Sequence, residues 1–236
     1  MITYLKIFLI VIHTFICSTI GLVVIFLDRS FTLYHYLAKV FPLGILIISG
    51  VRVKITGLEN IDRKSVYIFA SNHSSQIDIT ALQWGVPNRL SMIFKKELAR
   101  IPFFGWQLYL GPYVVVDRKD PQAAMKSLQR AKWIMDNKKI SVLVFPEGTR
   151  SKTGEVQSFK RGAFYLAAHS GYPIVPITIN GTDKIMPKGT SKLKSGTIYL
   201  HFDKPIPTDN IKSKPDELVL MEKVREIIIS NQKEYN

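Results

Sequence analysis

Two uncharged apolar runs of unequal length dominate the first 51 residues. The first run, residues 7–27, has 21 residues without a formal charge, enough at about 1.5 Å per residue to cross a hydrocarbon layer of roughly 30 Å. Asp28, Arg29 and Ser30 interrupt it. The second run, residues 40–51, has only 12 residues and is too short to span a bilayer. The pattern predicts a hydrophobic membrane-anchoring segment over residues 1–50, built as a helical hairpin or a single span.

Two membrane arrangements are compatible with these runs. Either the longer run crosses the bilayer, or both helices lie in one leaflet with Lys39, Arg52 and Lys54 near the headgroups. A cleaved signal peptide fits poorly, because its apolar region is shorter and ends in small residues. Loop charge predicts that the basic part after residue 27 lies on the cytoplasmic face of a cell inner membrane or endomembrane.

From residue 51 onward, short β-rich runs alternate with helical patterns. Many of the β-rich runs are continuously apolar, as in strands that are covered on both faces. This alternation predicts one α/β domain over residues 51–236, with a mostly buried, roughly seven-stranded mixed sheet flanked by helices. The expected strands are residues 51–56, 66–70, 90–94, 113–116, 141–145, 174–179 and 197–202.

The clearest helix of this domain follows Asp120 and Pro121. Aspartate is a favourable N-cap residue, and proline suits the first helical position. Two further helices are expected at about residues 161–169 and 215–230. In the first of the three helices, one apolar face is expected to pack on the core: Ala124, Leu128, Ala131 and Met135.

The charge balance narrows the classes of partner. The chain has 32 Lys and Arg against 18 Asp and Glu, a net charge of +14, so its partners are expected to be anionic: membrane headgroups, phosphorylated small molecules or nucleic acid. Nucleic acid is disfavoured because the aromatic residues lie largely in apolar runs rather than among the basic ones. The single cysteine, Cys17, excludes a disulfide or a cysteine metal site within one chain, and no metal is expected.

The segment SVYIFASNHSSQID, residues 65–78, carries the first candidate site. An apolar strand leads into His73, and Asp78 follows near the start of a new helix. Ligand sites are common where strands leave an open α/β sheet. An adjacent carboxylate can fix the tautomer of an imidazole and stabilise the imidazolium that forms when it takes a proton. His73 is therefore a candidate general base oriented by Asp78. The alternative is that His73 ends a strand and Asp78 caps a helix.

A second candidate site is FPEGTRS, residues 145–151, which also follows a buried strand. Gly148 allows backbone amides to approach an anion, Thr149 can donate a hydrogen bond, and Arg150 offers a planar fork suited to phosphate. Glu147 would repel phosphate, so it is expected to accept a hydrogen bond from a substrate hydroxyl or to hold Arg150. The alternative is a solvated turn. Further basic residues add to the positive field: Lys152, Lys160 and Arg161.

Together with two further blocks, these segments resemble the 1-acylglycerol-3-phosphate acyltransferases, the PlsC-like glycerolipid acyltransferases. NHSSQID matches the NHxxxxD block of that family, and FPEGTRS matches its third block. KKELARIPFFGWQLYLGPYVVVDR, residues 95–118, matches the second block, and IVPI, residues 174–177, matches the fourth. The four blocks follow one another in the family's order over roughly residues 51–202.

The resemblance implies that residues 51–236 are a catalytic domain that transfers a fatty acyl group from acyl-CoA or acyl-ACP to the free hydroxyl of lysophosphatidic acid, giving phosphatidic acid. No bound cofactor is implied, and the expected partners are the lysophospholipid, the thioester donor, membrane lipids and an acyl carrier protein. Other acceptors remain open, namely glycerol 3-phosphate, another lysophospholipid or an aminolipid. A membrane protein that binds anionic lipid without catalysis remains a further alternative.

The resemblance also implies roles for individual residues. His73 would be the base and Asp78 its partner, while the glycerol phosphate would be bound by Glu147, Gly148, Thr149 and Arg150. Further phosphate contacts are expected from three basic residues of the second block: Lys95, Lys96 and Arg118. Apolar residues of that block are candidates for an acyl-chain tunnel, with packing in the core as the alternative: Ile101, Phe103, Phe104 and Trp106.

Overall fold

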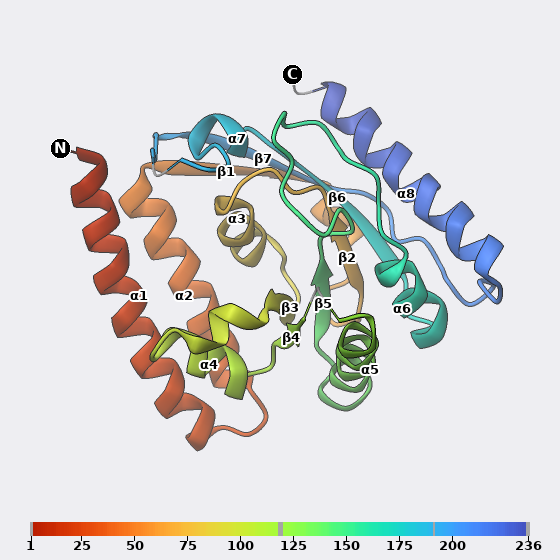
Figure 1. Cartoon of the computed structure of the whole chain (residues 1–236), viewed down its shortest axis with the longest axis horizontal. Coiled ribbons are helices and arrows are strands. Elements are labelled where there is room, and N and C mark those ends of the chain that lie inside the picture. Colours follow the sequence, from red (N-terminus) through yellow and green to blue (C-terminus); the bar gives the residue numbers. More distant parts are fainter. Residues whose placement is uncertain (1, 118–119, 191, 235–236) are drawn as a thin grey trace.

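The computed structural model describes residues 2–117, 120–190 and 192–234 of the chain (Figure 1). All seven expected strands form, and they lie in one sheet in the order β1-β7-β6-β2-β5-β3-β4. Their ends differ by at most two residues from those expected. The strands are β1 (Val51–Thr56), β2 (Ile68–Ser71), β3 (Leu90–Lys95), β4 (Val114–Val116), β5 (Ser141–Val144), β6 (Ile174–Asn180) and β7 (Gly196–Phe202).

The sheet is mixed, as expected. Strands β4, β3, β5, β2 and β6 are parallel to one another, β7 is antiparallel to β6, and β1 is parallel to β7. The carboxyl ends of the five parallel strands therefore meet at one edge of the sheet. In open α/β sheets, that edge is where ligands usually bind.

Helices cover both faces of the sheet (Figure 1). The apolar side chains of β2 alternate between the two faces, so that Phe69 packs with α3 while Ile68 and Ala70 pack with α5, α6 and α8. The helices are α1 (Ile2–Leu27), α2 (Thr32–Ser49), α3 (Ile77–Gly85), α4 (Phe104–Leu110), α5 (Pro121–Lys138), α6 (Gly162–Ser170), α7 (Thr182–Ile185) and α8 (Lys214–Glu234), with short 3₁₀ helices at Leu58–Asn60 and Lys96–Arg100.

Helix α5 begins as its sequence predicts. The Asp120 carboxylate accepts hydrogen bonds from the backbone N–H groups of Gln122 and Ala123, which satisfies donors that have no partner within the helix. Farther along, Ala131 and Met135 are completely buried against the sheet. The cap and the apolar face together fix where α5 starts and how it is rotated.

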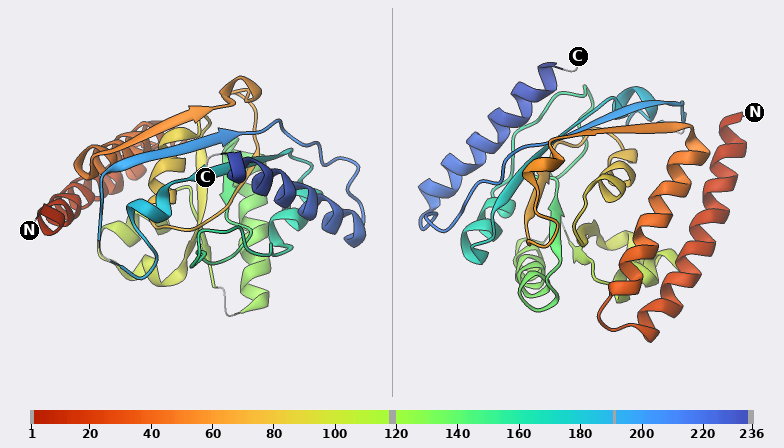
Figure 2. Two further views of the ribbon diagram at one scale, coloured as in Figure 1. Left: turned by 90° about the horizontal axis from the view of Figure 1, so that it is seen from above. Right: turned by 180° about the vertical axis from the view of Figure 1, so that it is seen from behind.

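The N-terminal residues form a hairpin of two helices that lie side by side (Figure 2). Both α1 and α2 are long and apolar enough to cross a membrane by length and composition. The second helix is longer than the apolar run of residues 40–51 predicts. It starts at Thr32 and has 18 residues, because its first turns carry polar and aromatic side chains that an apolar count excludes. Val51 belongs to β1 instead.

The hairpin packs against the rest of the chain on the α3 face of the sheet. Ile25 of α1 and Tyr34 of α2 share a buried apolar cluster with Phe94, Leu108 and Tyr113. The Lys39 ammonium group donates hydrogen bonds to the carbonyl oxygens of Gln83 and Val86 at the end of α3. Lys39 therefore contacts the protein itself, whereas the sequence predicted a position near the lipid headgroups. The outer surface of α1 exposes large apolar side chains: Leu5, Phe8, Val11, Phe15, Val23 and Phe26.

Candidate active site

The two candidate loops leave neighbouring strands at the same edge of the sheet. His73 follows β2 and Phe145 follows β5, and these strands pair in parallel. The two rings stack with centroids 3.9 Å apart and an interplanar angle of 18°. The backbone N–H of Ser151 donates to the carbonyl oxygen of His73 at 2.7 Å. The structure therefore brings together two segments that are about 70 residues apart in the sequence.

His73 and Asp78 form a direct pair. Nδ1 of His73 lies 2.7 Å from Oδ2 of Asp78, and the same oxygen accepts hydrogen bonds from the backbone N–H groups of Ser74 and Ser75, each at 2.8 Å. Asp78 is completely buried in the first turn of α3. Because a carboxylate can only accept, Nδ1 donates, so in the neutral ring Nε2 is the nitrogen that can take a proton. The His73 side chain lines a cavity.

Glu147 has partners that differ from those expected. Its side chain is buried, Oε1 accepts from the backbone N–H of His73 at 2.7 Å, and Oε2 accepts from the side-chain amide of Gln157 at 2.9 Å. Burial raises the pKa of the Glu147 carboxyl, although the hydrogen bonds that it accepts oppose this shift. The carboxylate therefore joins the two loops rather than holding Arg150.

The remaining residues of the Glu147–Arg150 turn lie at the surface of the site. Gly148 has a φ of 70°, and a Cβ atom there would lie 2.9 Å from Cε of Lys160, so both the backbone conformation and the space favour glycine. Thr149 is exposed, whereas Arg150 is half-buried and lines the same cavity as His73. Within the described residues, the Arg150 guanidinium forms no ion pair.

The basic residues of the second block point in different directions. Lys95 lines the His73 cavity and lies 3.2 Å from a carboxylate oxygen of Glu97 at the surface. Lys96 instead forms an ion pair with Asp117 at 2.6 Å, beside α5 and away from that cavity. Arg118 lies outside the described residues. Of the two lysines, Lys95 alone shares a cavity with His73 and Arg150.

A cavity of about 290 Å³ extends from His73 toward α2 and α4, and we call it the His73 cavity. Polar groups, namely His73, Lys95 and Arg150, gather at one part of its wall. Most of the remaining wall is apolar, with contributions from α2, α3, α4 and the sheet: Phe41, Ile79, Phe94, Phe104, Leu108 and Leu143. Such a shape fits a ligand with an anionic end and a long apolar chain.

The four tunnel candidates do not all lie in this wall. Phe104 lines the His73 cavity, whereas Phe103 and Trp106 pack on each other with ring centroids 5.3 Å apart. Phe103 also contacts the ring of Phe15 in α1, and Ile101 is exposed. Phe41 is not among the four tunnel candidates, because it lies 54 residues before the second block, which starts at Lys95.

Among the described residues, no group of three or more His, Cys, Asp or Glu side chains is placed to hold a metal ion. The site brings together a base, a cationic guanidinium and a buried carboxylate. A base next to an anion-binding group can remove a proton from a hydroxyl whose substrate is held by its phosphate.

Asn72 fixes the strand end that carries His73. Its buried side chain donates from Nδ2 to the carbonyl oxygen of Ile179 in β6 and accepts at Oδ1 from the N–H of the same residue, both at 2.9 Å. Asn72→Ala should lower the free energy of unfolding by about 2 to 4 kcal/mol, because two buried backbone groups lose their partner. Thermal unfolding in detergent measures this change.

The matched control is Asn137→Ala, since Asn137 is exposed and, among the described residues, its side chain makes a single hydrogen bond, to the carbonyl oxygen of Trp133. It should change stability by no more than about 0.5 kcal/mol. Equal stability of the two variants would contradict the anchoring role of Asn72.

The fold and the site define a class of protein: an α/β domain with a histidine–carboxylate pair and an arginine-bearing turn at the carboxyl edge of its sheet. The acyltransferase family model matches residues 52–180, which contain both loops, and the chain belongs to this family.

The chain is similar to several named acyltransferases. It is 35% identical over 185 residues to a 1-acyl-sn-glycerol-3-phosphate acyltransferase of Limnanthes douglasii, covering 78% of this chain and 64% of that protein. It is 36% identical over 188 residues to the protein of the same description in Saccharomyces cerevisiae, covering 78% and 61%. The chain thus spans about three fifths of the length of these two relatives.

A solved structure matches almost the whole chain. The crystal structure of the 1-acyl-sn-glycerophosphate acyltransferase PlsC from Thermotoga maritima superposes with a TM-score of 0.84 at 25% sequence identity. The match covers 99% of this chain and 94% of that one. The N-terminal hairpin and the mixed sheet are therefore shared by a solved member of the family.

Proposed function

We propose that this protein transfers a fatty acyl group from acyl-CoA or acyl-ACP to the free hydroxyl of lysophosphatidic acid, giving phosphatidic acid. The observation that carries this proposal is the position of His73 and Arg150 in the wall of one largely apolar cavity. A proton acceptor, an anion-binding group and an apolar wall are what a lysophosphatidic acid and a fatty acyl thioester require. The names of the relatives support the same activity.

In the proposed mechanism, His73 acts as the general base. Nε2 takes the proton of the acceptor hydroxyl while the hydroxyl oxygen attacks the thioester carbonyl carbon. Asp78 stabilises the imidazolium that forms. The tetrahedral intermediate then collapses, its carbon–sulfur bond breaks, and the leaving thiolate takes the proton from the imidazolium. The products are an ester and a free thiol, and no nucleophilic side chain is needed.

The phosphate of the acceptor is proposed to bind at Arg150 and Lys95. A guanidinium without a competing ion pair can form two parallel hydrogen bonds to phosphate oxygens. Gly148 and Thr149 would contribute backbone or hydroxyl donors at the turn. Lys96 and Arg118 stay predictions from the family resemblance, and the ion pair of Lys96 with Asp117 argues for a role away from the phosphate.

We propose that the acyl chain of the donor occupies the apolar part of the His73 cavity. Phe41, Phe104 and Leu143 line this part of the cavity. Phe103, Trp106 and Ile101 would instead contact lipid or α1. The exposed apolar face of α1 supports attachment of the hairpin to a membrane. We propose that the catalytic domain lies on the cytoplasmic face of that membrane, as the loop charges predict.

The test of the proposed function is a panel of acceptors offered with one acyl-CoA, with thiol release as the readout. Lysophosphatidic acid should give the highest kcat/KM, ahead of glycerol 3-phosphate, another lysophospholipid and an aminolipid. Preference for one of the other acceptors would overturn the assigned substrate. Binding of anionic lipid vesicles without thiol release from any acceptor would favour a binding protein over an enzyme.

Arg150→Ala should raise the KM for lysophosphatidic acid by about ten- to hundredfold, because a charged hydrogen bond to phosphate is worth roughly 1.5–3 kcal/mol. The kcat should change much less, since the base and its partner are untouched. Initial rates over a range of acceptor concentrations in mixed micelles separate the two constants.

Arg63→Ala is the matched control, because Arg63 is exposed in the loop that precedes β2, at the opposite end of the strand from His73. Its KM should equal that of the unmodified protein. An unchanged KM in Arg150→Ala would remove Arg150 from the phosphate site.

A further inference from the structure

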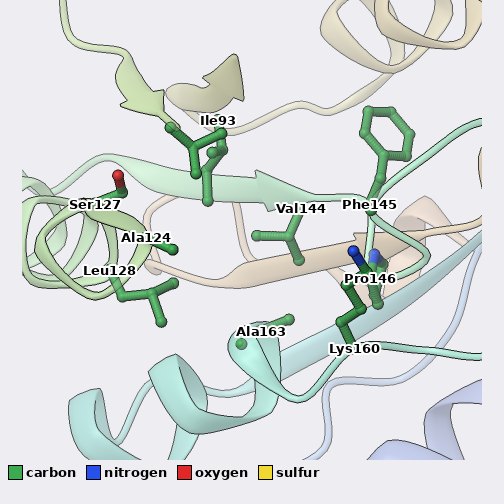
Figure 3. Close-up of a pocket in the computed structure, with 12 residues that line it drawn as sticks. Ile93, Ala124, Ser127, Leu128, Val144, Phe145, Pro146, Lys160 and Ala163 are labelled. Atoms are coloured by element: carbon green, nitrogen blue, oxygen red, sulfur yellow. The ribbon is translucent and has the colours of Figure 1, made fainter. Parts of the chain in front are cut away.

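A second cavity, of about 220 Å³, is lined by residues of α5, α6 and the sheet (Figure 3). It lies on the opposite face of the sheet from the His73 cavity. Successive residues of β5 separate the two, because Leu143 lines the His73 cavity while Val144 lines the second one. We call the second cavity the α5–α6 slot, after the helices that form its sides. Its lining includes Val116, Ala124, Leu128, Val144, Gly162 and Ala163.

The α5–α6 slot reaches the reacting groups of the proposed site. Phe145 and Ile93 line both cavities, and the Phe145 ring stacks on that of His73 at 3.9 Å. Gly148, next to the proposed phosphate position, also lines the slot. The two cavities thus approach the same point at the carboxyl edge of β5 from opposite faces of the sheet.

The lining of the slot is mostly carbon. Among the described residues that line it, Lys160 is the one with a charged side chain, and it lies beside Pro146 and against Gly148 (Figure 3). The hydroxyl of Ser127 already donates toward the carbonyl oxygens of Val115 and Ala123. A slender ligand with methylene and methyl groups and a few amides fits these walls, because the ammonium group can donate to an amide carbonyl oxygen.

The position of the slot favours the soluble donor over the lipid. It opens in the layer formed by α5 and α6, whereas the hairpin packs on the other face of the sheet (Figure 1). A lysophospholipid reaches the protein from the bilayer and therefore from the hairpin side. The carrier of the acyl group is dissolved in water and can reach the other face freely.

We infer that the α5–α6 slot binds the pantetheine arm of the acyl thioester donor. The acyl chain then lies in the His73 cavity, the arm lies in the slot, and the thioester between them lies beside Phe145 and His73. Coenzyme A and acyl carrier protein share this arm, so one slot serves either donor. The inference rests on the proposed function and adds the site for the non-transferred part of the donor.

Two substitutions can fill the slot from opposite walls. Ala124→Phe places a ring into it from α5. Gly162→Leu fills it from α6, and a Cβ atom at Gly162 would meet only Leu128 Cδ1, at an ordinary 3.8 Å. Ala123→Phe is the matched control, because Ala123 is the preceding residue of α5 and lines a different cavity. Each variant is assayed as the full chain in detergent with lysophosphatidic acid as acceptor.

The donors are decanoyl-CoA, decanoyl acyl carrier protein and the decanoyl thioester of N-acetylcysteamine, which lacks most of the arm. Both filling variants should lose at least tenfold in kcat/KM with a donor that carries the whole arm, and less than twofold with the N-acetylcysteamine thioester. Ala123→Phe should resemble the unmodified protein with all three. The intact carrier that the unmodified protein uses with the higher kcat/KM identifies the source of the arm.

Unchanged kcat/KM with both intact carriers in both filling variants would overturn the slot assignment, as would equal losses with all three thioesters. Calorimetric binding of desulfo-CoA, which cannot react, separates this inference from the proposed function. The unmodified protein could be inactive while the two filling variants, but not Ala123→Phe, weaken desulfo-CoA binding. That result would support the slot assignment and contradict the proposed activity. If the protein is active and the filling variants bind desulfo-CoA normally, the slot assignment falls alone.

Discussion

Replacing His73 with alanine is expected to lower kcat by at least about a thousandfold, because the variant has no group that can take the proton of the acceptor hydroxyl. His73 lies at the end of β2 with its ring stacked on Phe145. Removal of the ring leaves the backbone hydrogen bonds to Glu147 and Ser151 in place. The variant should therefore fold, attach to membranes and bind lysophosphatidic acid while releasing almost no thiol.

The matched control is His169→Ala, since His169 is exposed on α6 and stacks on Tyr165. Thiol release by purified protein, together with binding to liposomes, checks both variants. If His73→Ala kept a tenth of the normal rate, the base would have to be sought elsewhere in the molecule.

Asp78→Asn should lower kcat by about a thousandfold or more, although the new side chain has almost the same shape. The amide oxygen can take the place of Oδ2 and accept from Nδ1–H of His73 and from the N–H groups of Ser74 and Ser75, so the start of α3 should persist. The neutral amide no longer stabilises the imidazolium that forms when His73 takes the proton, so proton transfer should become much slower. Single-turnover rates and circular dichroism measure the two consequences.

Asp136→Asn provides the comparison, because Asp136 forms an exposed pair with Lys132 on α5. It should leave kcat unchanged. A similar small loss in both Asp→Asn variants would mean that Asp78 caps a helix without orienting His73, which is the structural alternative for this residue.

Most of the fold follows from local patterns. The strands near the centre of the sheet, such as β5 and β6, are mostly apolar in sequence and are buried along their whole length, because both faces are covered. The start of α5 follows from Asp120 and Pro121. The length of α2 could not be predicted from the apolar run of residues 40–51. Tyr34 and Lys39 are polar, but in the folded chain they are directed toward α3, α4 and the sheet. Burial of such residues depends on distant segments.

The same limit applies to the site. His73 and Asp78 are five residues apart, so a short loop and one helical turn suffice to predict their contact. The partners of Glu147, in contrast, include the backbone of His73, 74 residues away. The cavity wall combines Phe41, Phe104 and Leu143 from three parts of the chain. Ile101 and Trp106 were tunnel candidates because they belong to the second block, but both are exposed.

The hydrogen bonds that join the His73 loop to the Glu147–Arg150 turn have a consequence for protein engineering. Glu147 and Ser151 hold the backbone N–H and carbonyl groups of His73. A change in the position of the Glu147–Arg150 turn would therefore also move His73. Redesign of acceptor choice by lengthening or grafting either loop would displace the proton acceptor as well. Altered specificity is better sought in side chains of the surrounding helices, which can be exchanged while this connection stays intact.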